Sequence, residues 1–247
     1  MQLLVDIGNS SIKWALRRPG AADLAGFGAA MHGGALPLDL LAVWDELERV
    51  DAIIAAGVGP QSVKDAVTRV CQARWHLQPR WIGTSAEAHG VRIAYAEPAR
   101  LGVDRFLALV AAHRLPRPAP APSLIADAGT AITYDLLASD GTHLGGLILP
   151  GVRIMRDSLL AGTQIPRHEP ADADLPWAAD TGEAIAAASI QAPAALAERL
   201  HQRLAEHTGS TPRLILTGGD AERLAAAIAL PAESIPDLVL RGLAAFT

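Results

Sequence analysis

One short pattern occurs twice in this chain: an apolar strand ends in Asp-x-Gly and turns at once into a second strand. The first copy covers residues 3–14, with Asp6 and Gly8 after the apolar run, and the second covers residues 124–135. Apolar runs that resume as alternating segments after a glycine-containing turn predict β-hairpins. One such match arises easily by chance, but two between good strands predict a repeated unit and therefore two similar domains.

The first hairpin carries groups suited to a phosphate. Gly8 lets backbone amides approach closely, residues 9–11 offer side-chain donors, and Lys13 supplies a positive charge. Asp6 adds a carboxylate where a hydrated Mg²⁺ would need one. Taken alone, the segment fits equally well an ordinary hairpin in which Asp6 only caps the turn. With the second copy, two hairpins that meet across a cleft would hold a polyphosphate from both sides.

Composition limits the class of protein. A length of 247 residues fits one large domain or two ordinary ones, and a hydrophobic content of 50% provides a sizeable core. The net charge of -5 argues against a nucleic-acid binder. The single Cys71 excludes an internal disulfide and a cysteine-rich zinc site. Because neither a signal pattern nor a membrane-length apolar run is present, we expect a cytoplasmic protein with no membrane partner.

Strand and helix patterns alternate along the chain, which predicts an α/β fold. The proline-rich stretch 116–122 predicts a stiff connector, since four prolines cannot lie in a helix or a central strand. We therefore expect one domain over residues 1–115 and a second over residues 123–247. The expected helices cover residues 37–50, 61–75, 102–113, 152–160, 181–207 and 238–246, and the expected strands include residues 51–58, 80–82, 131–138, 144–149 and 213–216, with a loop or weak strand at 21–32.

Asp104 opens one of these helices. A carboxylate within reach of a hydroxyl can accept its proton during an attack, and Arg105 beside it can neutralise an anionic substrate. An Asp–Arg ion pair at a helix start is the alternative, because an acidic side chain is favourable there in any protein.

Four segments in order resemble the type III pantothenate kinases of the acetate and sugar kinase/Hsp70/actin superfamily. They are residues 6–13 (DIGNSSIK), 102–105 (GVDR), 127–135 (DAGTAITYD) and 145–151 (GGLILPG). Thr217-Gly218-Gly219 is similar to the superfamily's adenosine motif. Ser10 stands where the family often has threonine, which keeps the hydroxyl.

The resemblance implies an α/β fold of two duplicated ribonuclease-H-like (actin-like ATPase) domains with a nucleotide cleft between them. It implies the ATP-dependent phosphorylation of pantothenate to 4'-phosphopantothenate, the first step of coenzyme A biosynthesis. It also implies a homodimer, Mg²⁺ with the ATP, and a monovalent cation, K⁺ or NH₄⁺.

The resemblance further implies roles for single residues. Asp104 would be the base, Asp127 would lie at the monovalent cation, and Asp6 would meet hydrated Mg²⁺. The expected ATP-binding residues are Asp6, Ile7, Gly8, Asn9, Ser10, Ser11, Ile12 and Lys13, with Gly129 and Thr130 from the hairpin Asp127–Thr133, and Gly218 and Gly219. The expected substrate-binding residues are Tyr95, Gly102, Val103, Asp104, Arg105 and Thr181, the last of which could reach a neighbouring subunit's site.

Two other functions stay open on the residues alone. One is a kinase or phosphatase of the same superfamily that acts on another small substrate, and the other is a nucleotide-binding regulatory protein of the same fold. Asp135 could touch a hydrated metal or lie at an exposed strand position. The eight histidines are scattered without metal-ligand spacing, which favours surface or helix-end positions. Trp177, like other tryptophans, is expected to pack in a core or an interface. The loop 165–179 could be a mobile lid.

Overall fold

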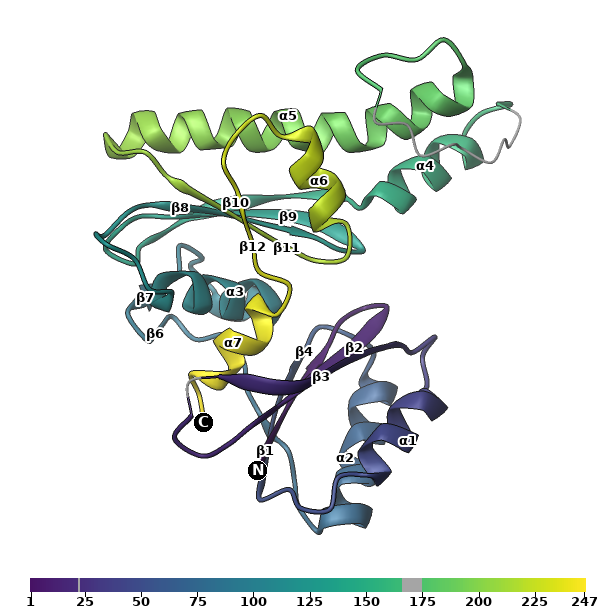
Figure 1. Cartoon of the computed structure of the whole chain (residues 1–247), viewed down its shortest axis with the longest axis vertical. Helices are drawn as coiled ribbons and strands as arrows, with labels where there is room; N and C mark the ends of the chain where they lie inside the picture. Colours follow the sequence, from purple (N-terminus) through teal and green to yellow (C-terminus); the bar gives the residue numbers. More distant parts are fainter. Residues whose placement is uncertain (22, 166–174) are drawn as a thin grey trace. The chain divides into compact units, whose positions relative to one another are not determined.

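The computed structural model describes residues 1–21, 23–165 and 175–247. They form two compact units, one of residues 1–115 with 237–247 and one of residues 116–236. Over the described residues, each unit contains a five-stranded mixed sheet with helices beside it (Figure 1).

The first unit is built on a sheet of strand order β3-β2-β1-β4-β5. Its strands are β1 (Gln2–Ile7), β2 (Ser11–Arg17), β3 (Leu24–Met31), β4 (Ala52–Gly57) and β5 (Arg80–Trp81). Its helices are α1 (Leu38–Asp45), α2 (Gln61–Trp75), α3 (Val103–Arg114) and α7 (Leu238–Ala244). A small hairpin of β6 (Glu87–Ala88) and β7 (Val91–Arg92) and a short 3-10 helix (Pro98–Arg100) precede α3.

The two faces of this sheet have different roles. Successive strand residues point to opposite faces, so Leu3, Val5 and Ile7 pack in the core beneath α1 and α2. Asp6 belongs to the other face, where α3 and α7 contact the sheet. Cys71 is fully buried in the first core, and burial raises the pKa of its thiol to about 12, so it behaves as a small apolar residue.

The second unit repeats the plan with the order β10-β9-β8-β11-β12. Its strands are β8 (Ser123–Ala128), β9 (Ala131–Leu137), β10 (His143–Pro150), β11 (Arg213–Thr217) and β12 (Glu233–Ser234). Its helices are α4 (Val152–Ala161), α5 (Thr181–Thr208) and α6 (Ala221–Ala227).

The two sheets confirm the predicted duplication. In each, the first three strands are antiparallel neighbours in sequence order, and the fourth and fifth add in parallel on the other side of the first. In both hairpins the aspartate lies one pair before the turn, Asp6 opposite Lys13 and Asp127 opposite Thr133, although the first turn is one residue longer. The repeat predicted from Asp-x-Gly is therefore a repeat of the whole sheet.

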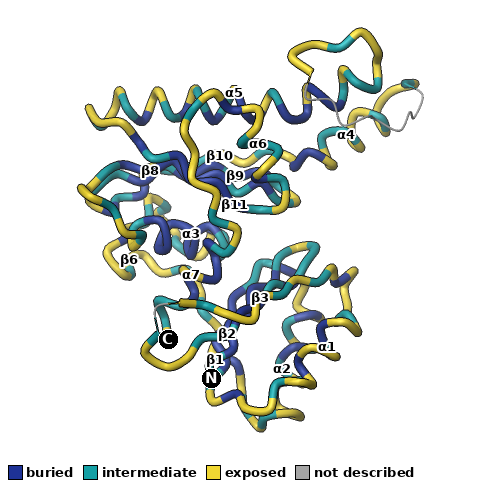
Figure 2. The backbone as a smooth tube through the Cα atoms, viewed as in Figure 1, coloured by how far each residue is buried: buried dark blue, intermediate teal, exposed yellow. Residues whose placement is uncertain are grey.

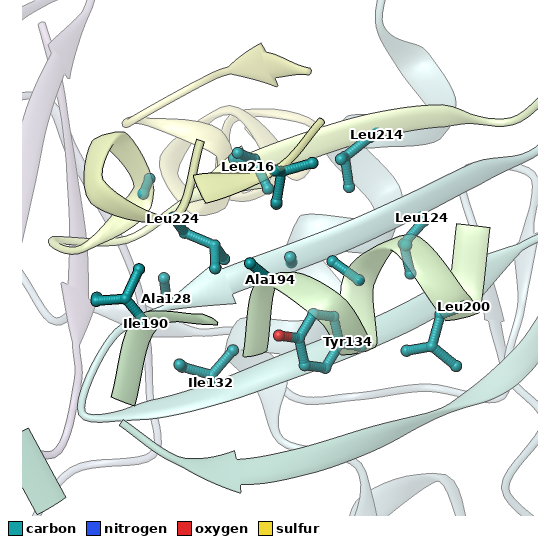
Figure 3. Packing of buried hydrophobic residues seen from close by; sticks show 14 of the residues in the cluster. Leu124, Ala128, Ile132, Tyr134, Ile190, Ala194, Leu200, Leu214, Leu216 and Leu224 are labelled. Carbon is teal, nitrogen blue, oxygen red and sulfur yellow. The ribbon is translucent and has the colours of Figure 1, made fainter. Parts of the chain in front are cut away.

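The core of the second unit lies between its sheet and α5 (Figure 3). Leucines from β8 and β11, Ile132 and Tyr134 from β9, and Ile190, Ala194 and Leu200 from α5 pack there. The Tyr134 hydroxyl donates a 2.7 Å hydrogen bond to the Pro193 carbonyl, which satisfies a buried polar group. The helix runs as one span through Pro193. Figure 2 shows that the inner strands of this unit are buried while α5 keeps an exposed outer side.

Several elements differ from the expectation. The predicted second domain extended to residue 247, but Asp237–Thr247 belong to the first compact unit. There α7 packs on α3 so closely that a Cβ on Gly242 would lie 2.0 Å from the Leu107 carbonyl oxygen. Helix α1 ends at Asp45 rather than near residue 50, and residues 24–31 form a full strand. An apolar pattern predicts a helix but does not say which sheet that helix covers.

Among the described residues, no helix has both the length and the apolar character needed to cross a lipid bilayer.

Candidate active site

The first hairpin is tightly closed. The Gly8 amide donates to the Ser11 carbonyl at 2.9 Å, and a Cβ on Gly8 would lie 3.2 Å from that same oxygen. Asp6, near the end of β1, is only 6% exposed, and its register partner Lys13 is half-buried. Directly opposite residues share one face of a sheet, so a carboxylate and an ammonium group flank the hairpin base together.

A glycine loop that the sequence analysis did not single out supports this hairpin. The amides of Val58 and Gly59, which follow β4, both donate to the Ile7 carbonyl at 3.0 Å. A Cβ on Gly59 would lie 2.3 Å from the Gly8 carbonyl oxygen, and one on Gly57 would lie 2.7 Å from the Ile7 oxygen. Only glycine permits so close a backbone approach. The Gly-x-Gly spacing at the end of a predicted strand is the signal that could have revealed this contact.

The same loop lies beside the first turn of α3. A Cβ on Gly102, the residue before α3, would lie 3.5 Å from Val58 Cγ1 and 2.5 Å from Asp104 Oδ1. Asp104 is the second residue of α3, and its Oδ1 accepts a 2.8 Å hydrogen bond from the Arg105 amide. Val58 thus connects the segment that carries Asp104 to the first hairpin, within one compact unit.

Two of the predicted substrate residues contact each other. Arg105 is 7% exposed, and its Nη1 donates to the Tyr95 hydroxyl at 3.2 Å. A buried arginine with a fixed direction can orient a tyrosine hydroxyl. A cavity of about 430 Å³ lies next to Tyr95 and also touches Glu97 and Arg100.

A second cavity of this unit, of about 530 Å³, is lined by two more of the predicted substrate residues, Gly102 and Val103. Its wall continues along α2 through Lys64 and Thr68 and closes at Trp81. Three predicted substrate residues of the first unit, Tyr95, Gly102 and Val103, therefore border one or other of two cavities, and Lys64 lines the larger one.

The second hairpin is closed in the same way. The Gly129 amide donates to the Ala131 carbonyl at 3.0 Å, and the Gly151 amide, just after β10, donates to the Thr130 carbonyl at 3.0 Å. A Cβ on Gly151 would lie 2.4 Å from the carbonyl oxygens of both Gly129 and Thr130. The final glycine of the GGLILPG segment is therefore required by contact with the hairpin.

The predicted adenosine segment packs on the base of this hairpin. Gly218 has a φ of +94°, and a Cβ there would lie 2.5 Å from both the Ala128 carbonyl and Asp127 Oδ1. The Asp220 amide donates to the Ala128 carbonyl at 2.9 Å. Gly219 faces open space. The structure thus brings Asp127, Gly129, Thr130 and Gly218 into one cluster.

Thr181 is the exposed first residue of α5, directly after the N-cap Asp180, whose Oδ1 accepts from the Gly182 amide at 2.8 Å. It belongs to the second unit. Most of the loop 165–179, interpreted as a lid, lies outside the described residues, as does His168.

Two polar predictions were wrong. Asp135 is not at an exposed strand position but is 2% exposed, and His143 Nε2 contacts its Oδ1 at 3.0 Å. His143 is likewise not on the surface, and His32 is only 6% exposed. A buried polar side chain needs a hydrogen-bond partner. The spacing of residues along the sequence does not show which partner the fold brings next to it. Trp177, expected in a core or an interface, is 82% exposed in this chain.

A duplicated α/β unit with an Asp-x-Gly hairpin at the same place in each copy defines the actin-like ATPase and sugar kinase class of folds. Solved structures agree. A Campylobacter jejuni protein described as a Baf family transcriptional activator gives a TM-score of 0.57 at 19% identity, covering 98% of this chain and 96% of its own. A Sinorhizobium meliloti protein described as a 2-dehydro-3-deoxygalactonokinase gives 0.51 at 16% identity, with 99% and 97% covered. These likenesses show the fold alone.

The family follows from sequence comparison. A profile of the type III pantothenate kinases matches residues 2–203. A type III pantothenate kinase of Nitrosococcus oceani is 37% identical over 99% of this chain and 92% of its own length, and one of Chromobacterium violaceum is 38% identical over 98% of each. The chain belongs to the type III pantothenate kinase family.

Proposed function

We propose that this chain transfers the γ-phosphoryl group of ATP to the primary hydroxyl of pantothenate, giving 4'-phosphopantothenate for coenzyme A biosynthesis in the cytoplasm. The observation that carries the proposal is the placement of Asp104. It opens α3 next to Val58, whose amide contacts the first hairpin. Family membership over nearly the whole chain supplies the substrate.

The two hairpins are proposed to bind the ATP phosphates. Gly8 and Gly129 keep each turn narrow, and the turn residues Asn9, Ser10 and Thr130 offer amides and hydroxyls. Lys13 adds positive charge, while Gly218 and Gly219 are proposed to lie along the adenosine. Turns that present amide and hydroxyl donors, with a nearby cation, are a recurring means of holding phosphates.

The carboxylates fit the proposed cations in their chemistry. Asp6 is a buried carboxylate at the end of β1, which suits one water-mediated or direct contact to Mg²⁺. Asp127 offers oxygen to a monovalent cation, K⁺ or NH₄⁺, beside the Gly218 turn. When bound, Mg²⁺ neutralises charge on the phosphates.

Asp104 is proposed to act as the base. As the pantothenate hydroxyl oxygen forms its bond to the γ-phosphorus, the bond from that phosphorus to the bridging oxygen breaks, and ADP leaves with the electron pair. The hydroxyl proton passes to the Asp104 carboxylate. Phosphoryl transfer needs mainly alignment and charge stabilisation, so one oriented carboxylate is sufficient for this step.

The substrate is proposed to bind in the first unit. Arg105 holds the Tyr95 hydroxyl at 3.2 Å, so that hydroxyl presents a fixed contact. Gly102 and Val103 border the cavity of about 530 Å³, whose Lys64 can attract the pantothenate carboxylate.

A homodimer is proposed on the apolar surface of the second unit. Strand β10 is an edge of its sheet, and Leu147 and Ile148 on it are 44% and 60% exposed. On the following helix, Ile154 and Leu159 are 37% and 43% exposed. An unpaired sheet edge can pair with a second chain, and apolar side chains exposed beside it would then be covered. A second copy is the partner the family resemblance implies, and Thr181 is proposed to contribute to the neighbouring site.

The dimer is testable by mass. Light scattering after gel filtration should give twice the chain mass of 25.8 kDa. Ile148→Lys places a charge in the proposed interface and should give the single-chain mass, whereas Val43→Lys, at a 43% exposed position of α1, should leave the dimer intact. A wild-type protein at the single-chain mass would refute the dimer.

The function is testable by coupled ADP release. With Mg·ATP, turnover should require pantothenate and should fall when K⁺ is replaced by Na⁺. Turnover with a sugar but not with pantothenate would favour the other superfamily kinase. ATP binding without turnover on any small hydroxyl compound would favour the regulatory alternative.

A further inference from the structure

His32 contacts the first hairpin through its backbone and its ring. It follows β3 directly, and its amide donates to the Ser10 carbonyl at 3.0 Å. Its ring Nε2 lies 2.9 Å from the Gly8 carbonyl oxygen. One residue therefore binds two carbonyls of the turn that is proposed to hold ATP phosphates.

The ring contacts define its tautomer. The Gly34 amide donates to His32 Nδ1 at 3.1 Å, so Nδ1 is an acceptor and the neutral ring carries its proton on Nε2. That proton points to the Gly8 carbonyl. Gly33 and Gly34 have φ values of +49° and +93°, and the Ala35 amide donates back to the His32 carbonyl at 2.8 Å. This turn needs two glycines, and it brings the Gly34 amide to the ring.

The second unit shows that the sheet itself does not need this histidine. At the equivalent place after β10, the Gly151 amide makes the same 3.0 Å bond to Thr130 without any side chain. The first hairpin differs in length, because Ile7 pairs with Ile12 around residues 8–11 while Ala128 pairs with Ile132 around residues 129–131. The longer turn contains the Gly8 carbonyl that the His32 ring binds.

We propose that His32 is a positioning residue for ATP: its ring fixes the Gly8 peptide so that the Asn9 amide is presented to a phosphate. In a planar trans peptide the carbonyl and the following N–H point in opposite directions. Since the Gly8 carbonyl points to His32, the Asn9 amide of the same peptide points to the other side of the turn. The inference rests on the proposed phosphate-binding role of residues 6–13.

Three substitutions separate the two ring contacts. His32→Gln places an amide donor near the position of Nε2, His32→Asn places an acceptor near the position of Nδ1, and His32→Leu removes both. His201 is the matched control, because its Nε2 contacts the Pro212 carbonyl at 2.9 Å in the second unit. His201→Leu therefore removes the same kind of ring contact away from either hairpin.

The experiment measures the Kd of Mg·ATP by calorimetry without pantothenate, together with KM for each substrate and the Tm. Loss of a buried carbonyl's partner should weaken ATP binding of His32→Leu about 10- to 100-fold. KM for pantothenate should not change, His32→Gln should recover most of the ATP affinity, and His32→Asn should recover less. His201→Leu should bind ATP as the wild type does.

Unchanged ATP affinity in His32→Leu would overturn the inference. So would an equal loss of ATP affinity in the three His32 variants and in His201→Leu that parallels their loss of Tm, because that pattern would indicate a general loss of stability. If His32→Leu does not fold, tighter ATP binding by His32→Gln than by His32→Asn supports the inference, and the reverse order contradicts it. A wild type that binds ATP but does not phosphorylate pantothenate would refute the proposed substrate alone, because the calorimetry needs no turnover.

Discussion

Asp104→Asn should lower kcat by about 10²- to 10⁴-fold, the range expected for loss of a general base. The substituted amide has the shape of the carboxylate, and its oxygen can still accept the 2.8 Å hydrogen bond from the Arg105 amide. It cannot take the proton of the attacking hydroxyl. KM for ATP should therefore stay close to the wild-type value, and the loss should appear in kcat, as measured by coupled ADP release.

Asp39 provides the matched control for this substitution. It is the second residue of α1, as Asp104 is of α3, so Asp39→Asn removes the same charge from the same place in a helix. Both variants lose the favourable interaction of a carboxylate with a helix N-terminus, which contributes about 0.3–1 kcal/mol. Full activity in both variants would exclude Asp104 as the base, and equal losses in both would indicate a structural cause.

Gly151→Ala should lower kcat/KM for ATP about 100-fold, because a displacement of about 1 Å at a reacting group can reduce the rate that much. The new methyl group would lie 2.4 Å from the Gly129 and Thr130 carbonyl oxygens, and these are backbone atoms that cannot rotate away. The hairpin must shift as a whole. Overpacking of this kind also costs about 1–3 kcal/mol of stability. The measurements are kcat/KM for ATP and thermal unfolding.

Two other glycines separate contact from backbone strain in this experiment. Gly219 has open space around its Cβ position, so Gly219→Ala should leave the Tm nearly unchanged. Gly209 also has open space but a φ of +67°, so Gly209→Ala tests strain without contact. If Gly151→Ala unfolds at the same temperature as Gly219→Ala and keeps its kcat/KM, the close packing of Gly151 on the hairpin has no functional consequence.

Much of the fold was predictable because its information is local. The apolar and alternating patterns of residues 3–14 and 124–135 predicted both hairpins. The proline-rich stretch 116–122 lies where the chain passes from the first compact unit to the second, between residues 115 and 116. The position of α7 was not predictable in this way. Its apolar face predicts a helix, but only the Gly242–Leu107 approach shows that it covers the first sheet.

The candidate site was proposed from residue type and motif order. Asp6 and Asp104 drew attention as carboxylates at a strand end and at a helix start, and it was the ordered set of family motifs that favoured their proposed roles over a turn cap or a helix-start ion pair. Residues that act by close backbone approach were harder to find. Gly59 and His32 approach the Gly8 carbonyl from 51 and 24 residues away along the chain, and contacts of that kind are formed only by the folded sheet.

The most direct test of the account follows the phosphorus itself. The protein is mixed with pantothenate and Mg·ATP in the presence of K⁺, and the products are observed by ³¹P nuclear magnetic resonance and mass spectrometry. The account predicts one new phosphomonoester on the primary hydroxyl of pantothenate, formed in equal amount to ADP and formed about 10²- to 10⁴-fold more slowly by Asp104→Asn. Phosphate released as inorganic phosphate, with pantothenate unchanged, would contradict it.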